Sequence, residues 1–336
     1  MPRKSRIDAP GALHHIICRG IERRAIFEDD DDRDRLVARL ATVLGETDTH
    51  CYAWALLPNH FHLLIQSGSM PVAGIMRRLL TGYAVNFNLR HRRSGHLFQN
   101  RYKSILCQAE PYLLELVRYI HLNPIRAGVV SDMKSLDGYP YSGHSRLMGK
   151  IKRGFQDTEK VLALFGPTRR TARRRYRDFV TKGLAAGKRP ELTGGGLIRS
   201  AGGWQALRGM RREGVHFKSD ERLLGDSDFV DSVLKAADET RDRKYRLQAA
   251  GYDFEEVVAR VCGIYHLNRR DLLSRGKQRR RAMARSVVAY WAVKELGMSV
   301  REAGEKLGLS PSAASRCVQR GERVVASDGQ VFEASL

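Results

Sequence analysis

Residues 57–65 read LPNHFHLLI, a turn signal followed by an apolar run. The Pro-Asn pair favours a turn, so the flanking segments 51–57 and 60–66 are predicted to be two paired strands. Alternate side chains of a strand point to one face, which places the imidazoles of His60 and His62 side by side. Two neutral imidazoles in this arrangement can bind a divalent metal ion. The alternative interpretation is a pair of half-buried histidines that make ordinary hydrogen bonds.

The segments around these two strands alternate between helical and extended patterns. Apolar residues recur at helical spacing in 30–44, in 72–89 and from Pro111 onward. Residues 13–18 and 101–107 are typical of short strands. The resulting order β-α-ββ-α-β-α predicts an α+β domain in which helices back a small antiparallel sheet.

The last of these helices carries a tyrosine and an asparagine on one face. Tyr119 and Asn123 are four residues apart, which is about one helical turn. An asparagine oxygen suits Mg²⁺ or Mn²⁺, and a tyrosine one turn away can attack a phosphorus atom held on that metal. Equally, Tyr119 can belong to the apolar core, and Asn123 can simply end the helix before Pro124. Tyr112, two turns earlier, is a second and weaker candidate nucleophile.

The charge of the chain points to a polyanionic partner. The sequence has 59 Lys and Arg against 37 Asp and Glu, a net charge of +22, and its pI is about 10.2. Nucleic acid is the first candidate for such a surface. No Asp or Glu occurs between residues 49 and 109, so a metal site there cannot use carboxylates. The cations expected to contact phosphate in or near this stretch, rather than form a solvated face, are Arg90, Arg92, Arg93, Arg101 and Lys103.

Several classes of protein are excluded by composition. No apolar run approaches the roughly 18 residues of a membrane span, and no apolar segment follows the basic N-terminus. The five cysteines are scattered and form no C-x-x-C pair, which argues against a disulfide framework and against a cysteine zinc site. A cytoplasmic protein without a membrane partner is expected.

Changes in composition divide the chain into four parts. A Gly-Pro pair at 166–167, a basic run at 169–177 and three consecutive glycines at 194–196 mark a boundary region. The predicted parts are an α+β domain, a basic helical connector, a second domain that is entirely helical, and a short tail. Their expected limits are residues 1–145, 146–250, 251–325 and 326–336.

The second domain contains a pattern typical of a helix-turn-helix. Ser299 caps one helix with Glu302 three residues later, a capping box, and Ser310 caps the next with Pro311 at its first position. The second helix of such a motif lies in the major groove of DNA. The alternative is a helical hairpin without a role in DNA binding. The residues expected to face DNA are Ser312, Ser315 and Arg316 on this helix, and Arg279, Arg280 and Arg281 upstream.

Three ordered blocks of the first domain resemble the tyrosine HUH single-strand transposases, in particular the REP-associated tyrosine transposases. (HUH denotes two histidines that flank a bulky hydrophobic residue.) The blocks are LPNHFHLLI at 57–65, GHLFQNRYKS at 95–104 and VRYIHLNP at 117–124. The resemblance covers about residues 8–145.

This resemblance implies a fold, a cofactor and a reaction. The fold is a ferredoxin-like antiparallel sheet with helices on one face. The cofactor is Mg²⁺ or Mn²⁺, held by His60, His62 and Asn123. Tyr119 then attacks a phosphodiester of single-stranded DNA, which leaves a 5′-phosphotyrosyl link and a free 3′-hydroxyl.

Residues 253–325 resemble the C-terminal DNA-binding domain of the replication initiator DnaA, although the Asp-His-Thr-Thr recognition run of that family is absent here. Together the two resemblances predict an enzyme that cleaves and rejoins single-stranded, hairpin-bearing DNA and binds duplex DNA through its C-terminal domain. Either a monomer or a homodimer is compatible with this prediction.

Three alternatives stay open at this level. The first is a DNA-binding regulator with an inactive nuclease fold, and the second is a protein that binds RNA hairpins by charge and stacking. The third is a phosphatase-like hydrolase, which would turn over substrate without a covalent adduct.

Overall fold

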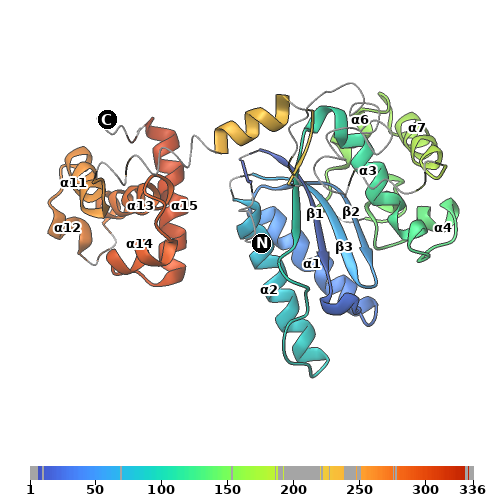
Figure 1. Cartoon of the computed structure of the whole chain (residues 1–336), viewed down its shortest axis with the longest axis horizontal. Helices are drawn as coiled ribbons and strands as arrows, with labels where there is room; N and C mark the ends of the chain where they lie inside the picture. The colour runs from blue at the N-terminus through green and yellow to red at the C-terminus, as the bar shows by residue number, and fades with distance from the viewer. Residues whose placement is uncertain are drawn as a thin grey trace, which may run out of the picture. The chain divides into compact units, whose positions relative to one another are not determined.

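The computed structural model divides the chain into two units, Met1–Val233 and Leu234–Leu336 (Figure 1). Each unit has its own hydrophobic core. The residues that the structure describes are 7–9, 11–68, 70–152, 154–185, 187, 192, 220, 222–226, 228–237, 247, 251–274, 276, 278–329 and 332.

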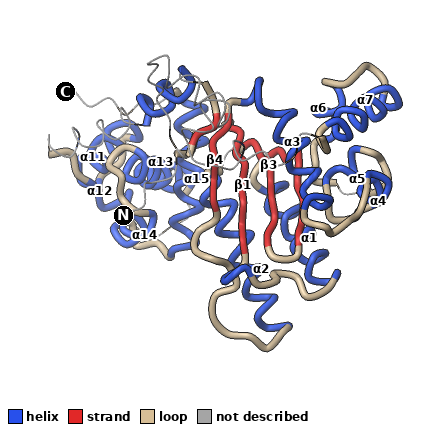
Figure 2. Tube along the Cα trace, turned by 45° about the vertical axis from the view of Figure 1, so that its right-hand side comes forward, coloured by secondary structure: helices blue, strands red, loops and turns tan. Residues whose placement is uncertain are grey.

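The first unit is built on a five-stranded sheet with the strand order β2-β3-β1-β4-β5. Figure 2 shows the central strands side by side. The first four strands pair in antiparallel fashion, as predicted, but β5 pairs with β4 in parallel, so the sheet is mixed. A segment far along the chain thus covers an edge that would otherwise expose unpaired backbone groups. The strands are β1 (Leu13–Arg19), β2 (His50–Leu57), β3 (His60–Gln66), β4 (Lys103–Cys107) and β5 (Leu223–Leu224).

Helices cover both faces of this sheet. Helices α1 (Asp30–Glu46) and α2 (Val72–Arg90) pack on one face, in a core that includes Trp54. Helix α3 (Ala109–Arg126) packs on the other face, against residues such as Leu64. The prediction of helices on one face is therefore wrong. The physical reason is that β2 is apolar at nearly every position and β3 carries apolar residues on both of its faces, so both faces of the sheet have to be buried.

Helix α3 does not end before Pro124, as the sequence analysis expected, but continues to Arg126. The proline lacks one N–H donor, yet its carbonyl and that of Asn123 still accept hydrogen bonds from Val129 and Ala127 at 2.9 and 2.8 Å. The proline takes only its own N–H donor out of the helical ladder, and these two carbonyls keep their partners. The spacing of Tyr119 and Asn123 on one helical face is preserved.

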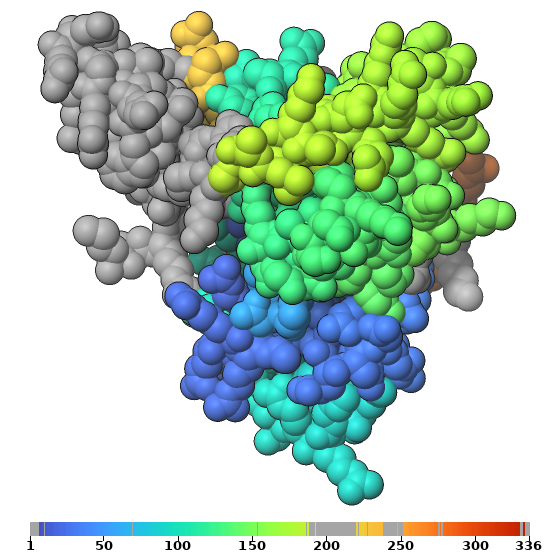
Figure 3. Space-filling model, turned by 90° about the vertical axis from the view of Figure 1, so that its right-hand side faces the viewer, coloured from blue at the N-terminus to red at the C-terminus, as the bar shows by residue number. Residues whose placement is uncertain are grey.

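Four short helices extend the side of the sheet that α3 covers, and Figure 3 shows them as green to yellow-green surface. Leu147, Val161 and Tyr176 are fully buried in the same core as α3. The described residues of the predicted connector up to Val233, including β5, therefore belong to the first unit, whereas most of 186–250 lies outside the described residues. The helices are α4 (Met133–Gly138), α5 (Gly143–Leu147), α6 (Thr158–Ala163) and α7 (Arg169–Lys182), and a 3-10 turn, η1 (Ile21–Arg23), follows β1.

The described elements of the second unit are helices around a core that includes Trp291. The predicted capping box of Ser299 and Glu302 is present, and Ser310 caps the following helix by accepting a hydrogen bond from Ala313 N at 3.4 Å. The last helix runs three residues into the predicted tail. The helices are α11 (Phe254–Tyr265), α12 (Arg269–Leu273), α13 (Arg279–Lys294), α14 (Val300–Lys306) and α15 (Pro311–Asp328).

No helix among the described residues is both long enough and apolar enough to cross a lipid bilayer.

Candidate functional site

Strand register gathers polar side chains on the sheet face that α3 covers. Arg19 of β1 lies directly opposite His60 of β3. Ile17 of β1 lies opposite His62 on one side and opposite Lys103 of β4 on the other. Directly opposed residues share a face, as do residues two apart on one strand. The two histidines and two cations, from three strands, therefore occupy one face of the sheet.

The predicted histidine pair is formed. The rings of His60 and His62 have centroids 5.2 Å apart. His60 Nδ1 lies 2.7 Å from Asn59 Oδ1, while the amide nitrogen of Asn59 donates to the carbonyl of Arg23. Because an amide oxygen only accepts, His60 Nδ1 is the donor, and the lone pair of the neutral ring is on Nε2. Nε2 of His60 is thus the atom available to bind a cation.

A third histidine, which the sequence analysis did not select, lies beside His62. His15 Nε2 and His62 Nδ1 are 3.0 Å apart, and the rings stack with centroids 5.3 Å apart. Both side chains are buried, with 0% and 4% of their surface exposed. A hydrogen bond to Nδ1 leaves Nε2 of His62 as the atom directed elsewhere. The signal in the sequence was the polar His14-His15 pair inside an apolar strand.

The environment holds the imidazoles of His60 and His62 neutral. Burial, followed by the positive charge of Arg19, lowers the pKa of His60 to about 4. Burial also holds the pKa of His62 well below its usual value, and the neighbouring His15, His60 and Arg19 act in the same direction. Neutral imidazole is the form that binds metal ions.

Tyr119 lies against this histidine cluster. Its ring makes edge contacts with His15 and His62, with centroids 5.9 and 6.0 Å apart. The guanidinium carbon of Arg126 lies 5.4 Å from the centre of the Tyr119 ring. The structure thus brings together the predicted nucleophile and the predicted metal ligand His62, which are far apart in the sequence.

Asn123 follows one turn after Tyr119 on α3. Its side chain is buried, with 8% exposed, and within the described residues its amide nitrogen has no hydrogen-bond partner. No group of three His, Cys, Asp or Glu side chains in the described part of the chain is arranged to hold a metal ion. Tyr112, the competing tyrosine, has Asp226 and Cys107 as its electrostatic neighbours, and burial raises its pKa.

The cations predicted to contact DNA in the first unit are not gathered at one place. Arg90 forms ion pairs with Asp29 and Asp32, each at 2.6 Å, and so neutralises the acidic start of α1. The guanidinium of Arg93 lies 5.5 Å from the centre of the Phe87 ring. Arg92, Arg101 and Lys103 are exposed, and Lys103 shares the face of the histidine pair.

The predicted contacts of the second unit lie on two helices. Arg279 and Arg280 are exposed at the start of α13, whereas Arg281 is half-buried and pairs with Asp271 at 3.2 Å. On α15, Ser312 and Arg316 are exposed and Ser315 is half-buried.

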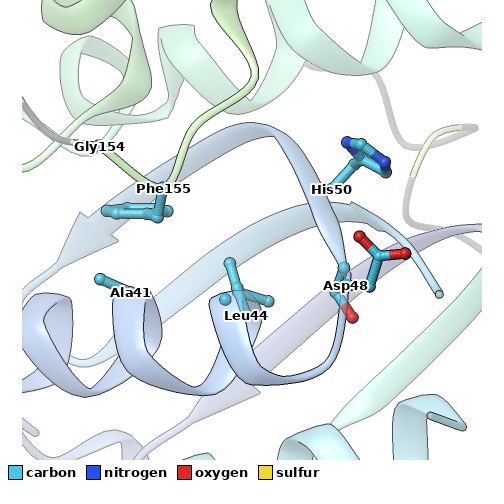
Figure 4. A pocket seen from close by; sticks show the side chains of 8 residues that line it. Ala41, Leu44, Asp48, His50, Gly154 and Phe155 are labelled. Carbon is cyan, nitrogen blue, oxygen red and sulfur yellow. The ribbon is translucent and has the colours of Figure 1, made fainter. Parts of the chain in front are cut away.

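A cavity of about 350 Å³ lies away from all of these residues. Figure 4 shows Phe155 facing Ala41 and Leu44 of α1, with Asp48 and His50 at one side. His50 begins β2, and His60 pairs with Leu57 at the other end of that strand. The cavity therefore does not belong to the site around Tyr119.

Comparison with known protein families finds a match within the first unit. Residues 10–123 match the family described as "Transposase IS200 like". This segment runs from just before β1 to Asn123, so it contains both histidines of the pair and Tyr119. This match supports the predicted resemblance of the first domain to transposases. The predicted likeness of residues 253–325 to the DNA-binding domain of the replication initiator is not tested by it and stays a prediction.

Among solved structures, the chain is similar to a REP-associated tyrosine transposase bound to a REP hairpin, at 18% sequence identity. The similarity covers 47% of this chain and 90% of that one, with a TM-score of 0.38. A comparison with curated proteins found no match.

Proposed function

We propose that this chain is a DNA transposase that cleaves and rejoins single-stranded, hairpin-bearing DNA through Tyr119. The observation that carries the proposal is the contact of the Tyr119 ring with the buried histidine His62, within a segment that matches a transposase family. The order β1-α1-β2-β3-α2-β4 supports a ferredoxin-like core for this activity.

The residues at the site fit a divalent cation. His60 and His62 have Nδ1 engaged in hydrogen bonds, so their Nε2 atoms are the candidate ligands. A half-turn of the Asn123 amide would offer an oxygen in place of the unpartnered nitrogen, which completes a set suited to Mg²⁺ or Mn²⁺. When bound, the cation would neutralise phosphate charge and orient the leaving group.

Tyr119 would supply the nucleophile. A bond forms between its phenolic oxygen and phosphorus, and the bond between phosphorus and the 3′ oxygen breaks. The phenol proton passes to solvent, and the departing oxygen takes up a proton to become a 3′-hydroxyl. Rejoining is the reverse step, in which a 3′-hydroxyl attacks the phosphotyrosine and Tyr119 recovers its proton. Neither step needs a water activated by a carboxylate, which agrees with the lack of Asp and Glu between residues 49 and 109.

The second unit would bind duplex DNA. Its α14 and α15 form two capped helices joined by a short turn, and Gly304 brings them so close that an added Cβ would lie 2.7 Å from the Cβ of Ala314. This is compatible with a helix-turn-helix whose second helix enters the major groove. Ser312, Ser315 and Arg316 would meet base edges there, and Arg279, Arg280 and Arg281 would contact phosphates.

A covalent-adduct assay tests the proposed function. Single-stranded oligonucleotides from the DNA that flanks the gene, labelled at the 3′ end, are incubated with protein and Mn²⁺ and run on a denaturing gel. A slow, protease-sensitive band is expected with wild type and with Tyr112→Phe, and it should be lost in Tyr119→Phe, in His62→Ala and with chelator.

Two outcomes would contradict the proposal. A band that survives Tyr119→Phe would assign the nucleophile to another residue. No band on any flanking hairpin, with duplex binding intact, would favour a DNA-binding regulator with an inactive nuclease fold.

A further inference from the structure

Arg126 lies on the same side of α3 as the residues of the proposed site. It follows Tyr119 by seven residues and Asn123 by three, and this spacing places all three side chains on one helical face. The guanidinium carbon lies 5.4 Å from the centre of the Tyr119 ring. The side chain is half-buried, and its Nη2 donates to the carbonyl of Gly183 at 3.4 Å.

We propose that Arg126 binds the phosphate group that Tyr119 attacks. The inference rests on the proposed function, because it names a catalytic residue of that site. The ligand class is a phosphodiester of single-stranded DNA. Neither the sequence pattern nor the family match assigns this arginine.

The chemistry of the guanidinium suits this role. It is planar and always charged, and its forked N–H donors match two phosphate oxygens at once. Negative charge grows on the phosphoryl oxygens as the bond forms, and a fixed donor stabilises it.

Cations lie on both sides of the proposed site. Arg19 lies opposite His60 on the sheet. Arg126 therefore places positive charge on the helix side of the site, while Arg19 does so on the sheet side. A phosphate beside Tyr119 would lie between them.

The end of α7 fixes the position of this part of α3. Gly183 is buried, and a Cβ added there would lie 2.5 Å from Cδ of Arg118 and 2.9 Å from Cδ1 of Leu122. Only a residue without a side chain lets the chain approach α3 so closely, and its carbonyl receives the hydrogen bond from Arg126. Helix α7 lies outside the segment that matches the transposase family.

Arg118 provides a matched control on the same helix. It is also half-buried, and its guanidinium lies 4.3 Å from the centre of an aromatic ring, that of Phe179. Its guanidinium pairs with Glu115 at 2.6 Å and packs on Phe179 rather than on Tyr119. Removal of Arg118 therefore disturbs a similar packing environment that does not involve the Tyr119 ring.

The first test measures the rate of covalent-adduct formation. Loss of one preorganised donor lowers such rates by about 100-fold, so Arg126→Ala is expected to fall by that factor. Arg126→Lys should recover part of the rate, whereas Arg118→Ala should stay within about threefold of wild type. Thermal unfolding of each variant shows whether it is folded. Equal rates for folded Arg126→Ala and Arg118→Ala would overturn the proposal.

The second test does not depend on catalysis. In a Tyr119→Phe background, the affinity for single-stranded oligonucleotide is measured by fluorescence anisotropy over a range of salt concentrations. Each phosphate contact contributes about 0.7 to the slope of log affinity against log salt, so Arg126→Ala should reduce the slope by about that amount. Arg118→Ala should leave it unchanged, and an unchanged slope in Arg126→Ala would also overturn the proposal.

The two tests separate the two claims. If wild-type protein forms no adduct, the proposed function fails, and the salt slopes alone then decide whether Arg126 binds phosphate. If wild type forms the adduct and Arg126→Ala does so equally well, the proposed function stands and the role of Arg126 fails.

Discussion

At the scale of single residues, the centre of the site is a hydrogen bond between two buried imidazoles. His62 Nδ1 and His15 Nε2 are 3.0 Å apart, with Tyr119 in edge contact with both rings. If His62 binds a cation through Nε2, its Nδ1 carries the proton. Nε2 of His15 then accepts the hydrogen bond from His62 Nδ1. His15 would then act as a positioning residue, because it holds the ring of His62 in one tautomer and one orientation.

Replacement of His15 by phenylalanine is expected to weaken metal binding. Loss of a partner of this kind typically lowers metal affinity about 10- to 100-fold, and the unpaired Nδ1 of His62 costs about 1–3 kcal/mol of stability. Calorimetric titration with Mn²⁺ and urea unfolding measure the two effects. His14→Phe is the control, since His14 lies on the opposite face of β1 and contacts Ser104 at 3.2 Å. Equal Mn²⁺ affinity in the two variants would contradict this role.

At the scale of elements, a chain of buried hydrogen bonds ties α3 to the helices behind it. Asp137 only accepts, so His144 Nε2 donates to it at 2.9 Å, and His144 Nδ1 is then the acceptor for the Tyr176 hydroxyl at 2.8 Å. The oxygen of Tyr176 in turn accepts from His121 Nδ1 at 2.8 Å. Because His121 lies between Tyr119 and Asn123 on α3, this chain fixes the helix of the proposed site on α5 and α7.

The same chain predicts that the protein loses stability in acid. Burial holds the pKa of His121 well below 6.5 and lowers that of His144, where the carboxylate of Asp137 opposes the effect. As pH falls below about 6.5, the unfolded chain binds protons that the folded protein does not, so stability decreases by up to about 1.4 kcal/mol per pH unit for each histidine.

Urea unfolding at pH 7.5, 6.5 and 5.5 measures this dependence. A double variant, His121→Gln with His144→Gln, is expected to show a smaller loss between pH 6.5 and 5.5 than wild type. Tyr176→Phe should cost about 1–3 kcal/mol at pH 7.5, because it leaves buried imidazole nitrogens without their partner. A pH dependence that is equal in the double variant and wild type would exclude this origin.

At the scale of the whole molecule, the chain consists of two units with separate cores. Units with their own cores can unfold independently, in which case a single unfolding free energy does not describe the protein. The close approach of α13 and α15 offers a way to perturb the second unit alone. A Cβ added at Gly321 of α15 would lie 1.9 Å from the carbonyl oxygen of Ser286 on α13.

Two glycine substitutions in the second unit are expected to act with opposite signs. Gly321→Ala should destabilise this unit by about 1–3 kcal/mol, because the backbone it meets cannot move aside freely. Gly263→Ala on α11 should stabilise it by up to about 1 kcal/mol, since nothing described lies within 4 Å of its Cβ and alanine is the better helix former. Calorimetry should show one transition moving and one unchanged, and a shift of both transitions would contradict independent units.

The sequence by itself determined the local features of this protein. The period of two in residues 60–66 placed His60 and His62 on one face, and the period of 3.6 placed Tyr119 one turn before Asn123. The predicted caps at Ser299 and Ser310 are likewise present. Each of these features depends on neighbours within about one or two turns of the chain.

Only the tertiary structure decided the contacts between distant segments. In the fold, β1 pairs with β3, which brings His15 beside His62. Helix α3 covers the second face of the sheet, which brings the Tyr119 ring against His15 and His62. Arg90, which was predicted to contact phosphate, forms ion pairs with Asp29 and Asp32 at the start of α1. Periodicity tells which face a side chain occupies but not which strand or helix lies opposite, because register is set by the packing of the whole core.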